Sequence, residues 1–247
     1  MNTQDLLGRI EPLLSRVNKP IQYVGGEYNS IVKEWQDVDV RWVLMYPDAY
    51  EVGQPNQGVA ILYEVLNERD WILAERTYSV WPDMEKQMRA AGIPQFTLDG
   101  HRPVRDFDIM SVSLSTELGY TNMLNAIDLA GIPVRQADRT DTDPIVLIGG
   151  HAAFNPEPVA DFIDAAVLGD GEEACLEISE IIRDWKKEGC PGGREGLLVR
   201  LAATGGIYVP SFYDVEYLDD GTIGKVAPNR LEAPYTCLLY TSDAADE

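Results

Sequence analysis

The 247-residue sequence lacks the features that mark several classes of protein. Its three cysteines, Cys175, Cys190 and Cys237, contain no C-x-x-C pair, so they cannot by themselves build a disulfide framework, a zinc site or an iron–sulfur cluster. No stretch approaches the roughly 18 consecutive apolar residues of a membrane span, and the N-terminus has no basic segment leading into an apolar core. These absences predict a cytoplasmic protein without a membrane partner.

Basic residues and histidines are also scarce. The chain has 20 basic against 41 acidic residues, and its net charge is −21. Such a field repels phosphate backbones, so we expect no nucleic-acid partner for this segment. Of the two histidines, His101 lies in a charged loop where we expect it to be solvated. The sequence has no P-loop, G-x-S-x-G or H-E-x-x-H motif. An enzyme that acts alone on a small molecule is therefore the least favoured hypothesis.

What is present is a regular alternation of apolar runs and amphipathic segments. Strands are predicted at 38–46, 72–80, 107–115, 144–150 and 163–171, and helices at 58–68, 82–92, 118–131, 156–162 and 172–189. Strands that alternate with helices indicate a parallel sheet covered on both faces. The predicted fold is therefore α/β: a doubly wound, mainly parallel five-stranded sheet of the Rossmann-like or flavodoxin-like type, with a small C-terminal β extension.

The same patterns divide the chain into four parts. Residues 1–37 form a helical or irregular lead-in, and residues 38–190 form the α/β domain. Residues 191–235 are expected to form a helix and a β-hairpin from about 207 to 226, with Asp220-Gly221 as its turn. We expect this third part to be looser than the core. Residues 236–247 carry no periodic signal.

Small residues gather in the loops that follow the predicted strands. These residues are Asp48, Tyr50 and Gly53 in a D-x-Y-x-x-G arrangement, Ser111 and Ser113, the pair Gly149-Gly150, and Gly169-x-Gly171. Each loop alone has an ordinary explanation as a cap, a strand end or a turn. Three nearby carboxylates disfavour a phosphate at the last loop: Asp170, Glu172 and Glu173. Because all these loops meet at the carboxyl edge of a parallel sheet, together they predict a place for a large flat cofactor.

Three segments carry a resemblance to a known family: YPDAYEVG (46–53), SLSTELGYTNMLNAIDLAGIP (113–133) and GGHAAFNPEPVADFIDAAVLGDGEE (149–173). The chain resembles the N-terminal region of radical SAM proteins that carry a cobalamin (B12)-binding-type domain before the catalytic barrel. In such domains a D-x-H-x-x-G loop supplies the lower cobalt ligand. Asp48 and Gly53 match that loop, whereas Tyr50 stands at the histidine position, which implies cobalamin binding of the His-off type.

The resemblance also assigns the other loops. Ser111 and Ser113 correspond to the serine motif and Gly149 and Gly150 to the glycine pair, both of which enclose the nucleotide tail of the cofactor. Gly169 and Gly171 would lie near its nucleotide end.

Members of the family continue into a radical SAM barrel, in which a C-x-x-x-C-x-x-C motif holds a [4Fe–4S] cluster that binds S-adenosylmethionine. This sequence has no such motif, so the cluster and S-adenosylmethionine are expected only in a full-length parent, whose barrel would be the partner. Residues 236–247 resemble translated sequencing-adapter read-through and are expected to be a non-native tail. The implied function is to position cofactor or substrate without catalysis by this segment alone.

Two other functions stay open. One is a cofactor-free docking or scaffold domain that packs on the barrel, which Tyr50 in place of histidine favours. The other is a free-standing flavodoxin-like binding protein.

Overall fold

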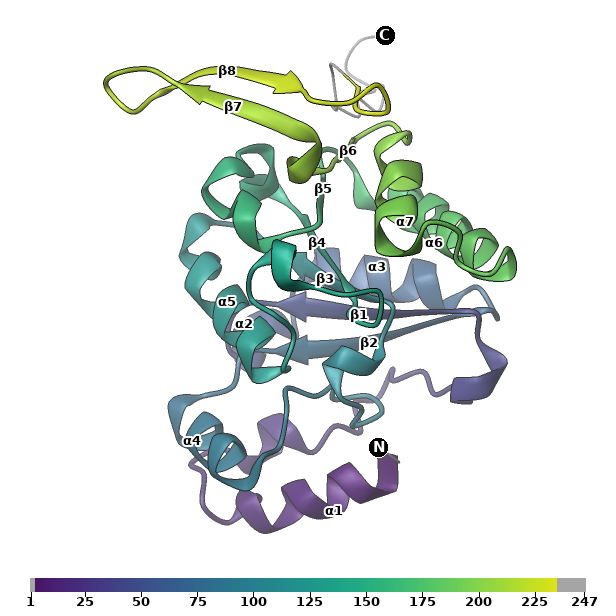
Figure 1. The fold of residues 1–247 in the computed structure, drawn as a ribbon. Helices are drawn as coiled ribbons and strands as arrows, with labels where there is room; N and C mark the ends of the chain where they lie inside the picture. Colours follow the sequence, from purple (N-terminus) through teal and green to yellow (C-terminus); the bar gives the residue numbers. More distant parts are fainter. Residues whose placement is uncertain (1–2, 235–247) are drawn as a thin grey trace, which may run out of the picture.

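Five apolar runs of the sequence form parallel strands in the computed structural model, which describes residues 3–234 (Figure 1). The strands are β1 (Val40–Tyr46), β2 (Ile72–Tyr78), β3 (Ile109–Ser113), β4 (Ile145–Gly149) and β5 (Ala165–Val167). A sixth strand, β6 (Ile207–Tyr208), joins them to give the order β2-β1-β3-β4-β5-β6. The predicted α/β class with a mainly parallel, doubly wound sheet is confirmed.

The strand order places a switch point beside the first strand. β1 pairs with both β2 and β3 in parallel, so the chain winds outward in opposite directions from β1. In sheets of this flavodoxin-like order, ligands bind outside the carboxyl ends of the strands near the switch point. The loops after β1 and β3 are therefore the first places to look for a site.

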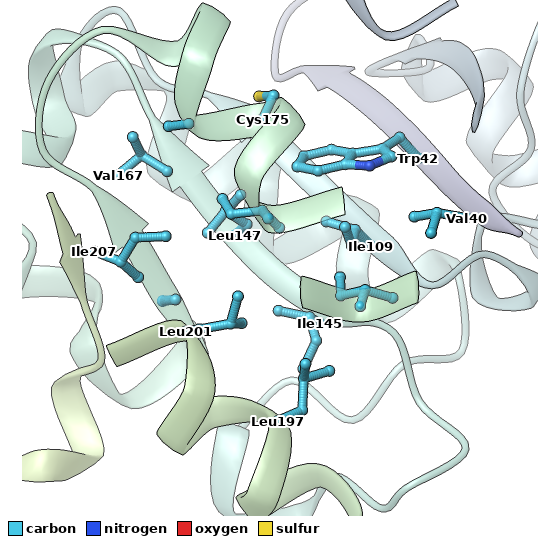
Figure 2. Packing of buried hydrophobic residues seen from close by; sticks show 14 of the residues in the cluster. Val40, Trp42, Ile109, Ile145, Leu147, Val167, Cys175, Leu197, Leu201 and Ile207 are labelled. Atoms are coloured by element: carbon cyan, nitrogen blue, oxygen red, sulfur yellow. The ribbon is translucent and has the colours of Figure 1, made fainter. Parts of the chain in front are cut away.

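Helices cover both faces because the parallel strands are apolar on both sides. One face packs against α3 (Gln57–Asn67), α6 (Gly171–Lys187) and α7 (Gly193–Ala202). Figure 2 shows Trp42, Ile109 and Leu147 of the sheet with Cys175, Leu197 and Leu201 of α6 and α7. The other face packs against α5 (Tyr120–Leu129). A third apolar cluster joins α1 (Thr3–Leu14) and α4 (Pro82–Ala91) beside β2.

Three predicted elements differ from the structure. The sheet has six strands rather than five, because Ile207–Tyr208 pairs antiparallel with β5 instead of belonging to the hairpin. The fifth strand covers Ala165–Val167 only. The expected helix at 156–162 is the 3₁₀ segment η7 (Glu157–Phe162), in which Pro158 has no backbone N–H for an α-helical ladder.

A buried ion cluster ties α7 to the sheet. The Asp164 carboxylate, immediately before β5, accepts hydrogen bonds from Arg139 Nη1 at 2.7 Å, Arg194 Nη2 at 2.6 Å and the Val146 N–H at 2.7 Å. Asp164 is 1% exposed, so its charge depends on these donors. Arg194 belongs to the first turn of α7. Its bonds to Asp164 therefore hold the start of α7 against β5.

His101 is not solvated as its charged neighbours predicted. The residue is 7% exposed, its ring stacks on Phe96 with centroids 5.9 Å apart, and Nε2 lies 3.1 Å from the Tyr23 carbonyl oxygen. The lead-in segment folds back over this loop and covers it. Local charge could not show this, because the covering residues are 78 positions away in the sequence.

The C-terminal hairpin is a separate sheet. β7 (Tyr213–Tyr217) and β8 (Ile223–Pro228) pair with each other only, and Asp220 and Gly221 lie in the turn between them, as predicted. Figure 1 shows the hairpin extending away from the main sheet. Most of its residues are exposed, whereas Leu197, Leu198 and Leu201 of α7 are buried in the core. Within residues 3–234 no helix combines the length and apolar character needed to cross a membrane.

Limited proteolysis tests whether the C-terminal hairpin is less stable than the core. We expect trypsin to cut first after Lys225, because a two-stranded hairpin with little buried surface opens locally at low cost. Arg139 and Arg194, with side chains 0% and 9% exposed, should stay uncut until the core unfolds. Mass spectrometry of the first fragments gives the order, and a first cut within residues 40–170 would contradict this expectation.

Candidate functional site

Three small residues form a shelf at the carboxyl edge of the sheet: Ser111 and Ser113 on β3 and Gly149 on β4. Ser113 pairs with Gly149, and Ser111 lies between Leu44 and Leu147. Those two leucines belong to the core under α3, α6 and α7, so the shelf is on the same face of the sheet. Ser111 is buried and Ser113 and Gly149 are half-buried, and a Cβ on Gly149 would meet no atom within 4 Å.

The loops after β3 and β4 hold each other in place beside the shelf. The Leu114 N–H donates to the Gly149 oxygen at 2.8 Å, and the Ala152 N–H donates to the Leu114 oxygen at 3.0 Å. Gly150 has φ +93°, and a Cβ there would lie 2.7 Å from the Leu114 oxygen. Gly150 is thus required by the close approach of two backbones. Of the two neighbouring glycines, Gly150 allows this backbone contact, whereas Gly149 leaves space unfilled.

The remaining predicted glycines lie at the start of α6. Gly169 follows β5 with φ +148°, and the preceding residue, Leu168, donates its N–H to the Gly206 oxygen at 2.7 Å. Gly171 begins α6, and a Cβ there would lie 3.3 Å from Leu62 of α3. Gly171 therefore lets the first turn of α6 approach α3.

The D-x-Y-x-x-G loop packs toward β2, on the other side of β1 from the shelf. Asp48 is exposed and accepts a hydrogen bond from the Ala49 N–H at 2.7 Å. Tyr50 and Gly53 lie in the short helix α2 (Tyr50–Gly53) and face Tyr78 of β2. The rings of Tyr50 and Tyr78 meet edge to face at 5.7 Å, and a Cβ on Gly53 would lie 2.4 Å from the Tyr78 ring. The structure therefore brings together Ser111, Ser113 and Gly149 but places Tyr50 and Gly53 in a separate cluster.

The phenol of Tyr50 is engaged by a carboxylate. Its hydroxyl donates to Glu27 Oε1 at 2.5 Å, and burial together with this bond raises the pKa of Tyr50 to about 12. A protonated phenol that donates to a neighbour does not fit the role of an axial cobalt ligand. At the shelf, a Cβ on Gly149 would meet no atom, and Gly149 lies opposite the half-buried Ser113. The bond between Tyr50 and Glu27 leaves no side chain of α2 in the role of an axial ligand.

Sequence reasoning missed four exposed large apolar side chains, one in each of four loops at the carboxyl edge, which together we call the apolar rim. The exposed fractions are 49% for Val52 after β1, 45% for Trp81 after β2, 87% for Leu118 after β3 and 56% for Phe154 after β4. Leu118 lies in η4 (Glu117–Gly119) and Phe154 in η6 (His151–Phe154). The sequence shows a large apolar residue in each of these loops, but only the structure shows which of them are exposed.

The described cysteines do not form a metal site. Cys175 is buried in α6, where desolvation raises its pKa to about 12 and keeps the thiol protonated, and Cys190 is exposed. No cluster of three or more histidine, cysteine, aspartate or glutamate side chains able to hold a metal ion occurs in the part of the chain that the structure describes.

A comparison with known protein families gives a match over more than half of the chain. A family model described as "Radical SAM proteins, N-terminal" matches residues 58–210, which is 153 of the 247 residues. The chain belongs to this family. The match to the radical SAM N-terminal family contains the shelf, the glycine loop before α6 and strand β6. Comparisons with curated proteins and with solved structures give no match.

A pair of glycine substitutions separates packing from open space. We expect Gly53→Ala to lower the free energy of unfolding by about 1–3 kcal/mol, because the new methyl group overlaps the buried Tyr78 ring. Gly149→Ala, the matched control, should change it by less than about 0.5 kcal/mol because its methyl group meets no atom. Denaturant unfolding measures both, and an equal loss in the two variants would contradict this account of the loops.

The raised pKa of Tyr50 predicts a loss of stability in alkali. The folded pKa of about 12 lies above the usual tyrosine value of 10.0, so the stabilisation is complete below pH 10 and is lost as the pH rises toward 12. Tyr50→Phe removes one such group, so its free energy of unfolding should fall less between pH 10 and 12 than that of the unmodified chain. Tyr23 and Tyr63 also have pKa values raised to about 12, so they should still make the stability of the variant decrease with pH in this range. Identical slopes in urea titrations across this range would refute the role of Tyr50.

Proposed function

We propose that this radical SAM N-terminal domain is a docking domain whose carboxyl edge packs on the catalytic barrel of its parent protein. The observation that carries the proposal is the apolar rim of Val52, Trp81, Leu118 and Phe154, one residue from each of four loops. A chain with net charge −21 has abundant polar residues for its surface, so exposed apolar residues at corresponding places on successive loops favour a partner.

The loops that carry the rim are held together, as a docking surface requires. The Asn122 side chain donates to the Pro47 oxygen at 2.9 Å, which links α5 to the loop after β1. A Cβ on Gly119 would lie 2.9 Å from Pro47, so the turn that bears Leu118 also lies against that loop. Because the surface is already ordered, little conformational entropy is lost when a partner binds.

Binding to a separately expressed barrel tests this function. The probe is the radical SAM barrel of a longer family member, titrated with the chain by calorimetry. We expect binding that weakens at least tenfold in Leu118→Ser and in Phe154→Ser, because a few large apolar side chains that a partner buries supply most of the affinity of an interface.

Val32→Ser is the matched control, because Val32 is 77% exposed in the lead-in. Its neighbour Lys33 bonds the Ile72 oxygen at the opposite, amino end of β2. Binding that is absent from the unmodified chain, or that weakens equally in the control, would count against docking through this edge.

Corrinoid binding is a second candidate, favoured by the open space at Gly149. Ser111, Ser113 and Gly149 would lie against the nucleotide tail, and cobalamin when bound would supply methyl transfer or assistance in a rearrangement. The chain's own share is to bind, orient and exclude water from the cofactor. No side chain from α2 is needed in this arrangement, because the Tyr50 hydroxyl already donates to Glu27.

A titration with hydroxocobalamin, followed by gel filtration and visible absorbance, tests this candidate. We expect co-elution with a base-off spectrum that Tyr50→Phe leaves unchanged, and loss of retention in Gly149→Leu, whose side chain would fill the shelf. Val32→Ser, at an exposed residue of the lead-in, is again the matched control and should retain the cofactor. No retention at tens of micromolar protein, or a spectrum altered by Tyr50→Phe, would argue against this mode of binding.

A further inference from the structure

A small cavity lies at the carboxyl end of β2, and Tyr50 is one of the residues that line it. It has room for the centre of one water-sized molecule, about 10 Å³. The lead-in contributes Gln22 from η1 (Pro20–Tyr23), the loop after β2 contributes Ser79, and the connection between α4 and β3 contributes Gln95. No charged side chain is among the residues that line it: Gln22, Tyr23, Tyr50, Thr77, Tyr78, Ser79, Val80, Gln95, Phe96 and Leu98.

Four polar atoms of the residues that line the cavity are buried and make no hydrogen bond of normal geometry in the structure. They are both Oε1 and Nε2 of Gln22, Oγ of Ser79 and Oε1 of Gln95. Gln22 is 3% exposed and Gln95 is 2% exposed. Buried side-chain amides in folded proteins nearly always form hydrogen bonds, so a concentration of such atoms on one small cavity points to a ligand.

The orientation of Gln95 is fixed by its other bonds. Its Nε2 donates to Thr77 Oγ1 and to the Tyr78 oxygen, both at 2.8 Å. These two bonds use the donor end of the amide, so the Gln95 carbonyl is an acceptor that requires a donor from elsewhere. Gln22 offers one further acceptor and one donor group, and the Ser79 hydroxyl can serve as either.

We propose that this cavity is a binding site for an ordered water molecule. Water matches the available room, and it matches the mixed set of donors and acceptors because it can donate two hydrogen bonds and accept two. The uncharged lining disfavours an ion. The bound water joins the lead-in, the end of β2 and the α4–β3 connection, and thereby supports the segment against which Tyr50 packs.

The sign of a stability change tests the proposal. Gln22→Met keeps the length of the side chain but removes its polar atoms. If water binds there, the variant loses those hydrogen bonds, and we expect its Tm to fall by roughly 2–8 °C. If Gln22 has no partner, removal of two unsatisfied buried atoms should instead raise the Tm, which would overturn the proposal.

Two further variants keep the test independent of a packing defect. Ser79→Ala deletes one hydroxyl without adding volume, and it should also lower the Tm, by roughly 1–4 °C. Gln36→Met is the matched control at an exposed glutamine and should leave the Tm within about 1 °C. An unchanged or higher Tm for Ser79→Ala would count against the site.

A crystal structure at better than about 2 Å resolution gives the direct readout. We expect density for a water within hydrogen-bond distance of the Gln22 amide and the Gln95 carbonyl. The Glu51 carboxylate lies near enough to Gln22 for that amide to help lower the pKa of Glu51, although Lys19 is the larger cause. A Gln22 amide bonded directly to Glu51, with no water in the cavity, would refute the proposal.

Discussion

The parallel alignment of β1 to β5 is the constraint on which the rest of the structure depends. Parallel strands need crossover connections, and each crossover places a helix on one face of the sheet. Both faces are thereby buried, and a ligand or partner reaches the sheet through the loops at the strand ends. Because every carboxyl end points to one edge, the loops after β1 to β4 converge there. The shelf and the apolar rim are two consequences of this single arrangement.

Burial of the strand ends requires that charged groups near them find partners within the protein. Asp164 meets this requirement with two arginines, and Arg76 of β2 pairs with Asp99 at 2.7 Å with side chains 4% and 1% exposed. Buried pairs of this kind add little net stability over apolar packing, but a lone buried charge is strongly unfavourable. They therefore fix which segments lie together, as Asp164 does for α7, rather than supplying the main stabilisation of the fold.

The residues of the carboxyl edge fall into two groups with different physical roles. Tyr50, Gly53 and Gly150 are explained by contacts within the chain, namely the Tyr78 ring and the Leu114 carbonyl. Gly149 lies beside space that the chain itself does not fill, and the four loops at this edge each expose one large apolar side chain. Exposed apolar side chains on successive loops are suited to contact with a partner. Membership of the radical SAM N-terminal family favours the barrel of a longer family member as the proposed partner.

Hydrophobic periodicity is a local property, so it was enough to predict the α/β class, the succession of the five parallel strands along the chain and the loops at the carboxyl edge. It could not determine that Ile207 and Tyr208 extend the main sheet, since an apolar pair does not specify which strand it joins. Nor could it determine that His101 is buried or that Tyr50 bonds Glu27, since the covering residues are distant in the chain. Whether a glycine at this edge serves packing, as Gly150 does, or leaves space, as Gly149 does, depends on atoms from neighbouring strands, so it follows only from the three-dimensional arrangement.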